Sequence, residues 1–215
     1  MAGGDDLSRA PLPVDLDRLL HDLRGPLNAV VLHLEALKRL VGDDQTARAS
    51  VQSIQGEMER LAAMLPLAFA VCALELGTPQ RLLVRALVES AVDESARKRV
   101  VVAPGAWPEV EGDERLLVLA VRQLIMNALE ASGDDGEVRI SVEPGAGGAV
   151  TLIVEDSGGG FKTRNPNAIV RLMADAKPGH AGVGLLIAQR VARLHGGSLV
   201  FETRPGGAVV RMTFR

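Results

Sequence analysis

The sequence predicts an α+β chain in two parts: a helical hairpin that forms a dimeric four-helix bundle, followed by an α/β sandwich. Three observations support this prediction. Apolar residues recur at alternating steps of three and four through two N-terminal segments, which is a heptad pattern. Further along, β-rich runs alternate with helical patterns, and two Gly-rich turns each join a pair of such runs.

The N-terminal part is predicted to hold two long helices behind a short tail. Residues 1–14 are rich in glycine and proline and indicate a flexible N-terminal tail. The apolar positions of the first helix are Leu16, Leu20, Leu23, Leu27, Val30, Leu34, Leu37 and Val41. After a break at residues 42–44, the second helix repeats the pattern at Val51, Ile54, Met58, Leu61, Leu65, Ala68 and Cys72. Two such helices joined by a short turn form an antiparallel hairpin, which we expect to span residues 15–76.

The seam of this hairpin favours self-association. Two helices alone cannot surround a heptad seam, so part of the apolar surface would stay in water. Pairing with a second copy of the chain buries that surface in a four-helix bundle. We therefore expect a homodimer.

A second domain is expected to follow the breaker Gly77-Thr78-Pro79 and to span residues 80–215. Its helical patterns cover residues 80–97, 113–132 and 184–194. Its β-rich runs cover residues 100–102, 138–143, 149–155, 198–203 and 208–214. Gly-rich turns join the second of these runs to the third and the fourth to the fifth, as two hairpins. Together these elements predict one mixed sheet with helices on one face.

Composition and charge exclude several classes of protein. The 215 residues carry 24 Lys and Arg against 27 Asp and Glu, a net charge of −3, with only 2% aromatics. Such a chain has neither the basic face nor the stacking platform of a nucleic-acid binder, so we expect no nucleic-acid partner. Arg97, Lys98 and Arg99 form a short basic run that is typical of a solvated face. The single cysteine, Cys72, excludes an internal disulfide framework and a Cys-rich zinc site.

The hydrophobic runs give no sign of a membrane protein. Residues 1–7 contain two aspartates and no apolar stretch of the kind that begins a secretory signal. The longest uncharged run, Leu61 to Leu74, is shorter than the roughly 20 residues that span a bilayer. We therefore expect a cytoplasmic protein with no membrane partner, which receives its stimulus through a separate sensor protein.

His21 and Asp22 are the candidate reactive pair of the hairpin. His21 follows the seam residue Leu20, so its side chain lies beside the apolar stripe and can face solvent. A neutral imidazole is abundant near pH 7 and offers a nucleophilic ring nitrogen. The adjacent carboxylate of Asp22 can orient the ring or act as a base. An isolated His-Asp pair on a helix is more often an ordinary surface feature, so its interpretation depends on the second domain.

The second domain carries two candidate ligand-binding motifs around its first β-hairpin. Asp156 follows a predicted strand, and a carboxylate there can accept a hydrogen bond from the exocyclic amine of a buried purine. Gly158 and Gly160 follow it and let the backbone approach a ligand closely. Asn127 lies at the edge of the apolar stripe of the helix at 113–132, where its carboxamide oxygen is a suitable ligand for Mg²⁺.

A third motif opens the helix at 184–194. Gly182 and Gly184 expose backbone N–H groups at a helix N-terminus, which is a favourable place for phosphate. Lys177, a few residues earlier, can add a positive charge. Each glycine cluster alone is weak evidence, because glycine is common in ordinary loops. The clusters are much more specific in this order, each beside the expected strand or helix.

With these residues in view, the chain resembles the catalytic core of a two-component sensor histidine kinase over about residues 15–215. His21 with Asp22 matches the H-box of the HisKA-type dimerization and phosphoacceptor domain. Asn127 matches the N-box of the HATPase_c domain, and residues 156–160 and 182–184 match its two glycine boxes. The resemblance implies a Bergerat-type (GHKL) nucleotide fold for the second domain.

The resemblance also implies an activity and its partners. It implies an ATP-dependent protein histidine kinase in which His21 accepts the phosphoryl group and Asp22 assists as base or orienter. ATP would be held by Asp156, Gly158, Gly160, Lys177, Gly182 and Gly184. Mg²⁺ would be held through ATP by Asn127. The phosphoryl group would then pass to an aspartate in the receiver domain of a response regulator.

Three alternatives remain open. His180 and Ala181 replace residues usual in the nucleotide lid of the family, which favours a histidine phosphotransfer adaptor with a degenerate domain that does not bind ATP. The glycine boxes are largely present and favour the kinase. A non-kinase ATPase of the same superfamily would have a Glu base on the Asn127 helix, where this chain has Gln123, and would lack the His21 hairpin. An anti-sigma-factor serine kinase would lack that hairpin too.

Overall fold

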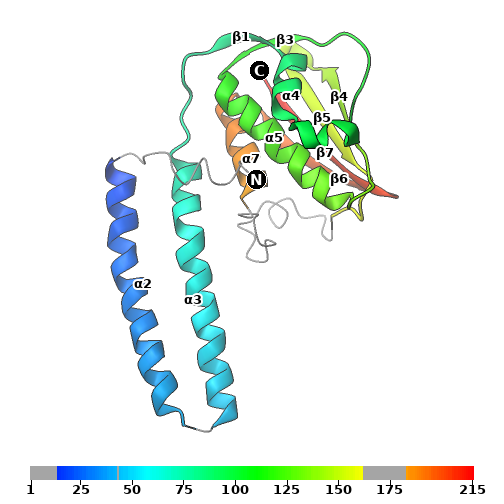
Figure 1. Ribbon diagram of the computed structural model, residues 1–215. Helices are drawn as coiled ribbons and strands as arrows, with labels where there is room; N and C mark the ends of the chain where they lie inside the picture. The colour runs from blue at the N-terminus through cyan, green and yellow to red at the C-terminus, as the bar shows by residue number, and fades with distance from the viewer. Residues whose placement is uncertain (1–13, 43, 162–182) are drawn as a thin grey trace. The chain divides into compact units, whose positions relative to one another are not determined.

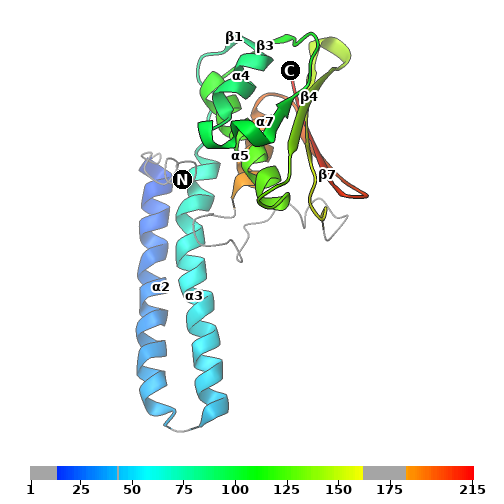
Figure 2. The same ribbon diagram turned by 45° about the vertical axis from the view of Figure 1, so that its right-hand side comes forward.

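The computed structural model describes residues 14–42, 44–161 and 183–215 (Figures 1 and 2). These residues form two compact units, one made of residues 14–73 and the other of residues 74–161 and 183–215. The first unit is a helical hairpin and the second is a sheet covered by helices (Figure 1). The predicted α+β fold class, with a hairpin before an α/β sandwich, is confirmed.

The hairpin consists of α2 (Val14–Leu40) and α3 (Gln45–Cys72), which run antiparallel (Figure 1). Gly42 takes a positive φ of 56° in the turn between them, a conformation that glycine adopts without steric cost. The Asp44 carboxylate caps α3 by accepting hydrogen bonds from the N–H groups of Thr46 and Ala47. The predicted N-terminal tail, 1–14, falls outside the described residues except for Val14, which begins α2.

The heptad seam of the hairpin divides into two rows with different exposure. One row lies between the helices and includes Leu20, Leu34 and Val51, which are 3%, 6% and 3% exposed. The other row remains 39–47% exposed in the single chain and consists of Leu23, Val30, Leu37, Ile54 and Leu61. The heptad spacing places alternate seam positions on two adjacent stripes of each helix. One stripe faces the other helix of the hairpin, and the second stripe faces away from it. The hairpin therefore closes with one stripe and leaves the other open.

The second unit is built on a five-stranded sheet with the order β2-β4-β5-β7-β6. Its strands are β2 (Val100–Val102), β4 (Val138–Pro144), β5 (Val150–Asp156), β6 (Ser198–Arg204) and β7 (Gly207–Phe214). The sheet is mixed, because β2 pairs parallel with β4 and every other pair is antiparallel. The two predicted hairpins and the mixed sheet are therefore confirmed.

Three helices cover one face of this sheet: α4 (Val84–Ala91), α5 (Glu114–Ala131) and α7 (Gly184–Leu194) (Figures 1 and 2). The layer between helices and sheet contains fully buried side chains such as Leu124 of α5, Ile187 of α7 and Phe214 of β7. Burial of a large apolar side chain contributes about 1.5–3 kcal/mol, so this layer is the main source of stability in the unit. α5 packs against both α4 and α7 and is the central helix of the layer.

The predicted helix at 80–97 is wrong at both ends. Residues Gln80–Leu83 form a strand, β1, which pairs antiparallel with β3 (Glu109–Gly112) in a separate two-stranded sheet. After α4 the chain forms a 3₁₀ helix, η1 (Glu94–Arg99). Only the middle of the predicted helix is α-helical. The start of the segment pairs instead with β3, a strand that is distant in sequence and that was not predicted.

Asp113 and His195 join the start of α5 to the end of α7. The Asp113 carboxylate accepts hydrogen bonds from the N–H groups of Leu116, which caps α5, and of Gly77 (3.1 and 2.8 Å). The backbone N–H of Asp113 donates to His195 Nε2 at 3.0 Å, while Nδ1 of the same ring contacts the carbonyl of Val191 at 2.9 Å. Both ring nitrogens of the buried His195 are therefore paired, and the far ends of α5 and α7 are held together.

Candidate functional site

Asn127 lies where α5 meets the N-terminus of α7. A methyl group placed on Gly184, the first residue of α7, would lie 3.0 Å from Asn127 Nδ2 and 2.8 Å from Gln123 Oε1. Asn127 Nδ2 is buried and has no hydrogen-bond partner among the described residues. A buried polar group without a partner costs about 1–3 kcal/mol, so the carboxamide is available to a group that the described residues do not supply.

The N-terminus of α7 offers N–H donors that suit an anion. Val183 occupies the N-cap position, and no side chain in the described part of the chain caps this helix. The first N–H groups of an α-helix have no partner within the helix, and the helix dipole gives this end a partial positive charge. Within the described residues, the site therefore combines the N–H donors at the start of α7 with the amide of Asn127 beside them.

Asp156 ends β5 on the side of the helices. Its Oδ1 accepts hydrogen bonds from the N–H groups of Gly158 and Ala208, at 2.9 and 3.1 Å. These two bonds fix the carboxylate, and within the described residues no hydrogen bond reaches Oδ2. Oδ2 is therefore an acceptor held in place and available to a ligand.

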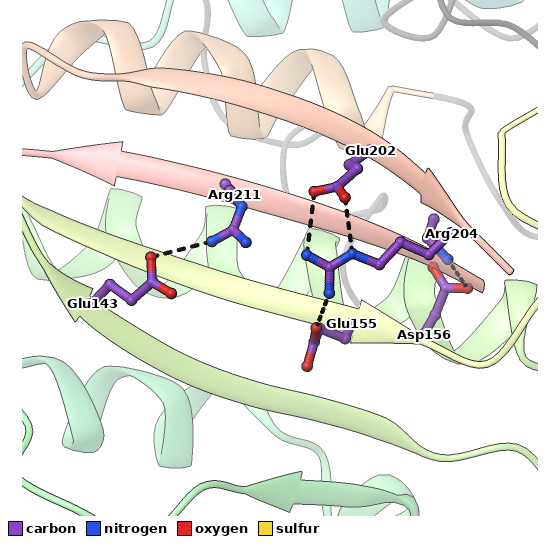
Figure 3. Close-up of polar contacts among 7 residues, drawn as sticks. Glu143, Glu155, Asp156, Glu202, Arg204 and Arg211 are labelled. Atoms are coloured by element: carbon purple, nitrogen blue, oxygen red, sulfur yellow. Dashed lines mark hydrogen bonds and ion pairs between the residues drawn. The ribbon is translucent and has the colours of Figure 1, made fainter. Parts of the chain in front are cut away.

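The preceding carboxylate, Glu155, points to the opposite face of the sheet. There it pairs with Arg204, which also binds Glu202, while Arg211 pairs with Glu143 in the same open layer (Figure 3). The hydrogen bond from Arg204 holds the pKa of the Glu202 carboxyl below its ordinary value. Successive side chains of a strand alternate between faces, so only Asp156 of this pair can serve a site on the helix side.

The glycine loop after Asp156 is pressed against the C-terminal end of α5. A methyl group on Gly158 would lie 2.3 Å from the carbonyl oxygen of Ala131 and therefore cannot fit without a shift of the backbone. Ala131 lies one helical turn after Asn127, on the same face of α5. Asn127 therefore lies between the glycine loop on one side and the N-terminus of α7 on the other.

The β6–β7 hairpin holds the same loop from its other side. A methyl group on Gly207 would lie 1.8 Å from the carbonyl oxygen of Asp156. Gly160, at a φ of 73°, has no room for a methyl group beside Thr203, and the Thr203 hydroxyl accepts the N–H of Phe161 at 3.1 Å. The phenyl rings of Phe161 and Phe201 meet edge to face with centroids 5.4 Å apart. The loop is thus fixed by close backbone packing on both sides.

The sequence-predicted residues fall into three groups. Asn127, Asp156, Gly158, Gly160 and Gly184 come together in the second unit, around the C-terminal half of α5. His21 and Asp22 lie in the other unit, on α2, with side chains 83% and 65% exposed and 3.6 Å between His21 Nδ1 and Asp22 Oδ1. Lys177 and Gly182 lie outside the described residues.

Several residues that shape the site were missed. Gly207 packs against the Asp156 carbonyl, and a glycine two residues after Pro205 in a hairpin turn gave no hint of this contact. The Ser132 hydroxyl accepts the N–H of Ser157 and so ties α5 to the glycine loop. Arg99, assigned to a solvated face, is half-buried and binds the carbonyls at the end of α5. None of these residues belongs to a motif, because each acts through a contact that is distant in sequence.

Comparisons with known proteins agree with this geometry. Residues 112–215 match the HATPase_c family, described as histidine kinase-, DNA gyrase B-, and HSP90-like ATPase. The sensor protein BasS of Escherichia coli strain K12 is 29% identical over 93% of this chain and 58% of its own length. The adaptive-response sensory kinase SasA of Parasynechococcus marenigrum strain WH8102 is 30% identical over 89% of this chain and 53% of its own length. The chain thus spans about half the length of the curated relatives that it matches.

Solved structures show the same fold. The catalytic domain of histidine kinase ThkA matches 66% of this chain and 95% of that domain, with a TM-score of 0.57 and 22% identity. Full-length ShkA, in complex with AMPPNP, matches 95% of this chain and 46% of that protein, also with a TM-score of 0.57 and 22% identity. The first similarity covers about two thirds of the chain and the second nearly all of it.

A helical hairpin followed by a sheet domain with this glycine loop and this Asn helix defines a histidine kinase-like ATPase core. Residues 112–215 match the HATPase_c family, and the chain as a whole is similar to sensor histidine kinases. Its described residues include no helix that is both long and apolar enough to span a membrane.

Proposed function

We propose that this chain is the catalytic core of a histidine kinase that transfers the γ-phosphoryl group of ATP to His21 and then to an aspartate of a response-regulator receiver domain. In this proposal residues 15–76 are the dimerization and phosphoacceptor domain and residues 80–215 are the ATP-binding catalytic domain. One observation carries it: Asn127 Nδ2 is buried without a hydrogen-bond partner among the described residues, and it lies beside the N-terminus of α7, which no described side chain caps. The family match of residues 112–215 supports the same function.

The donors and acceptors of the site suit ATP. Asp156 Oδ2 can accept the exocyclic amine of adenine, and the close packing of Gly158 leaves backbone rather than side chain facing a ligand. The N–H groups at the start of α7, with Gly182 and Lys177 before them, can bind the phosphates. The nucleotide in the ShkA complex, whose protein shares the fold, supports a nucleotide here.

Asn127 also fits a role in binding Mg²⁺ together with ATP. Rotation of its carboxamide places either the nitrogen or the oxygen at the same position, and an amide oxygen is a hard ligand of the kind that Mg²⁺ prefers. When bound, Mg²⁺ neutralises charge on the phosphate oxygens. Among the described residues, two side-chain amides lie beside Gly184, those of Asn127 and of Gln123 one turn earlier, and Asn127 is the one proposed for this role.

His21 has the exposure and the neighbour that a phosphoacceptor needs. Its imidazole is 83% exposed, and Asp22 lies nearest to Nδ1, which favours the tautomer with the proton on Nδ1 and the lone pair on Nε2. Nε2 attacks the γ-phosphorus, the N–P bond forms, and the bond from phosphorus to the β,γ-bridging oxygen breaks with release of ADP. The Nδ1 proton stays on the ring beside Asp22. In the second step a receiver carboxylate oxygen attacks the phosphorus, and the N–P bond breaks to return neutral His21.

The test of this function is incubation of the purified chain with γ-labelled ATP and Mg²⁺. We expect label on the protein that is stable in alkali and lost in acid, as for a phosphoimidazole and unlike a serine or threonine ester. Label that survives acid contradicts a histidine acceptor. Absence of both label and ATP binding by calorimetry contradicts the kinase and favours a phosphotransfer adaptor, which a phosphorylated receiver domain would charge.

The open apolar row of the hairpin supports a homodimer. Its five side chains, on both helices, expose 39–47% of their surface in a single chain. Burying a large aliphatic side chain contributes about 1.5–3 kcal/mol, so a second hairpin that covers this row gains several such contributions. The same row on the partner provides the matching surface in a two-fold symmetric bundle.

A charge in the open row should separate the dimer. Ile54→Lys places an ammonium group in the proposed interface, while in a lone chain the residue is 47% exposed and tolerates it. We expect sedimentation velocity to show a dimer for the wild type and a monomer for Ile54→Lys at the same concentration. Gln52→Lys, an exposed position on the same helix, is the matched control and should stay dimeric. A wild-type monomer, or a dimer in both variants, contradicts the proposed interface.

A further inference from the structure

Arg99 binds three backbone carbonyls at the C-terminal end of α5. Its Nε donates to the carbonyl of Gly136 at 3.0 Å, and its Nη2 donates to the carbonyls of Leu129, at 3.2 Å, and Gly133. Val100 pairs with Val138 in the parallel β2–β4 ladder, so the backbone of Arg99 lies beside the entry to β4. From there the side chain reaches across residues 132–137 to the last turn of α5.

The chemistry of the contact suits arginine. The last carbonyls of an α-helix have no partner within the helix, and they carry the negative end of the helix dipole. A guanidinium group presents several donors in a fixed planar fork, so one side chain can satisfy carbonyls of both the helix and the following loop. A lysine ammonium keeps the charge but cannot reproduce this fork.

The turn that Arg99 holds is also the turn that supports the glycine loop. Ala131 lies within it and packs against Gly158, where a methyl group would come within 2.3 Å of the Ala131 carbonyl. Ser132 follows and accepts the N–H of Ser157 at 3.2 Å, while the Ser157 hydroxyl donates to the carbonyl of Glu137 at 3.3 Å. Arg99 thus fixes both ends of the short loop on which residues 157 and 158 rest.

We propose that Arg99 is a positioning residue for nucleotide binding: it fixes the end of α5 and the loop at 132–137, and through them the Asp156 glycine loop that receives the adenine. This inference rests on the proposed function for the identity of the ligand. Arg99 does not touch the ligand in this proposal, because its Nε and Nη2 point to carbonyls of α5 and of the following loop.

Arg99 differs from its neighbours in the basic run, because in this proposal only Arg99 positions the nucleotide-binding loop. Lys98 is exposed and belongs to the same 3₁₀ helix, η1, so it offers a matched control for charge and chain position. Arg99→Met keeps most of the aliphatic stem and removes every donor. Arg99→Lys keeps the charge and removes the fork, and it serves as a milder variant should Arg99→Met unfold.

The experiment compares these variants in the full chain by two independent readouts. The first is backbone hydrogen exchange of peptides covering residues 152–160 in nucleotide-free protein, which reports on the loop whatever the ligand is. The second is the concentration dependence of autophosphorylation on ATP. We expect faster loop exchange and a KM for ATP raised about 10-fold in Arg99→Met, as for other residues that act through a ligand-binding neighbour. Arg99→Lys should be intermediate, and Lys98→Met should match the wild type.

The split between KM and kcat distinguishes positioning from irreversible loss of folded protein. Irreversible loss lowers kcat at unchanged KM, because fewer molecules are active, whereas a displaced binding loop raises KM. Reversible partial unfolding would also raise the apparent KM, because ATP binds only the folded molecules, so peptides covering strands β4 and β7 are followed as well. Faster exchange confined to residues 152–160 identifies positioning, and faster exchange throughout the sheet identifies unfolding.

Loop exchange in Arg99→Met that equals the wild type overturns this inference. So does a KM for ATP in Arg99→Met that equals the KM of a wild type that uses ATP. Neither result contradicts the proposed function. A wild type that binds no ATP overturns the proposed function, and faster exchange in the variant would then show Arg99 to be a residue of the fold only.

Discussion

Replacing His21 with glutamine should abolish transfer of label from γ-labelled ATP to the chain while leaving its affinity for ATP unchanged. Glutamine keeps a polar side chain of similar length but has no nucleophilic ring nitrogen, so the N–P bond cannot form. His21 is 83% exposed on α2, so its loss removes no buried contact and should shift the free energy of unfolding by less than about 0.5 kcal/mol. Labelling, ATP calorimetry and thermal melting of the same preparation test the three parts of this prediction.

His33 provides the matched control for the His21 variant. It lies further along the same helix, is also exposed, and has no carboxylate at the next position that would correspond to Asp22, since Leu34 follows it. His33→Gln should therefore label as the wild type does. Label that persists in His21→Gln identifies another acceptor, and label lost from both variants indicates damage to the hairpin rather than removal of an acceptor.

The parts of the fold that sequence could predict are those set by short-range patterns. The heptad seam predicted both helices of the hairpin, because a stripe of apolar residues is a local property of a helix. It could not tell which row closes the hairpin and which, with Leu23 and Ile54, stays open, since that depends on how the two helices are rotated about their axes. The strand at Gln80–Leu83 was missed for a related reason: its partner at Glu109–Gly112 lies far along the chain.

In the candidate site, too, the residues of the sequence motifs were predicted, and the residues that hold them in place were not. Asn127, Asp156 and the glycines were found from the sequence, because their chemistry is concentrated in short segments beside predicted elements. The contacts that fix them were not, as with Gly207 against the Asp156 carbonyl and Arg99 against the end of α5. The basic run containing Arg99 resembles any solvated surface in sequence, and only the β2–β4 pairing brings it to α5. Residues that bind are thus easier to predict than residues that position them.

Asn127→Ala should abolish autophosphorylation without unfolding the chain. Truncation removes the only amide oxygen of this residue that can reach Mg²⁺, while the lost nitrogen has no hydrogen-bond partner in the described structure. Because no described residue loses a hydrogen bond in the nucleotide-free protein, we expect the free energy of unfolding to change by less than about 1 kcal/mol. Thermal melting and sedimentation should therefore match the wild type, including its association state, while the rate of labelling falls by at least about 100-fold.

The dependence on Mg²⁺ separates metal binding from a general effect on the site. Removal of Mg²⁺ with a chelator should weaken binding of ATP to the wild type much more than to Asn127→Ala, because the variant has already lost the protein group that couples the metal to the site. Glu114→Ala, which removes an exposed carboxylate from the first turn of the same helix, should retain the wild-type response to the chelator. If the chelator lowers the affinity for ATP equally in the wild type and in Asn127→Ala, the Asn127 carboxamide does not bind Mg²⁺. The unpartnered amide would then serve the phosphates directly, as a donor beside the N–H groups of α7.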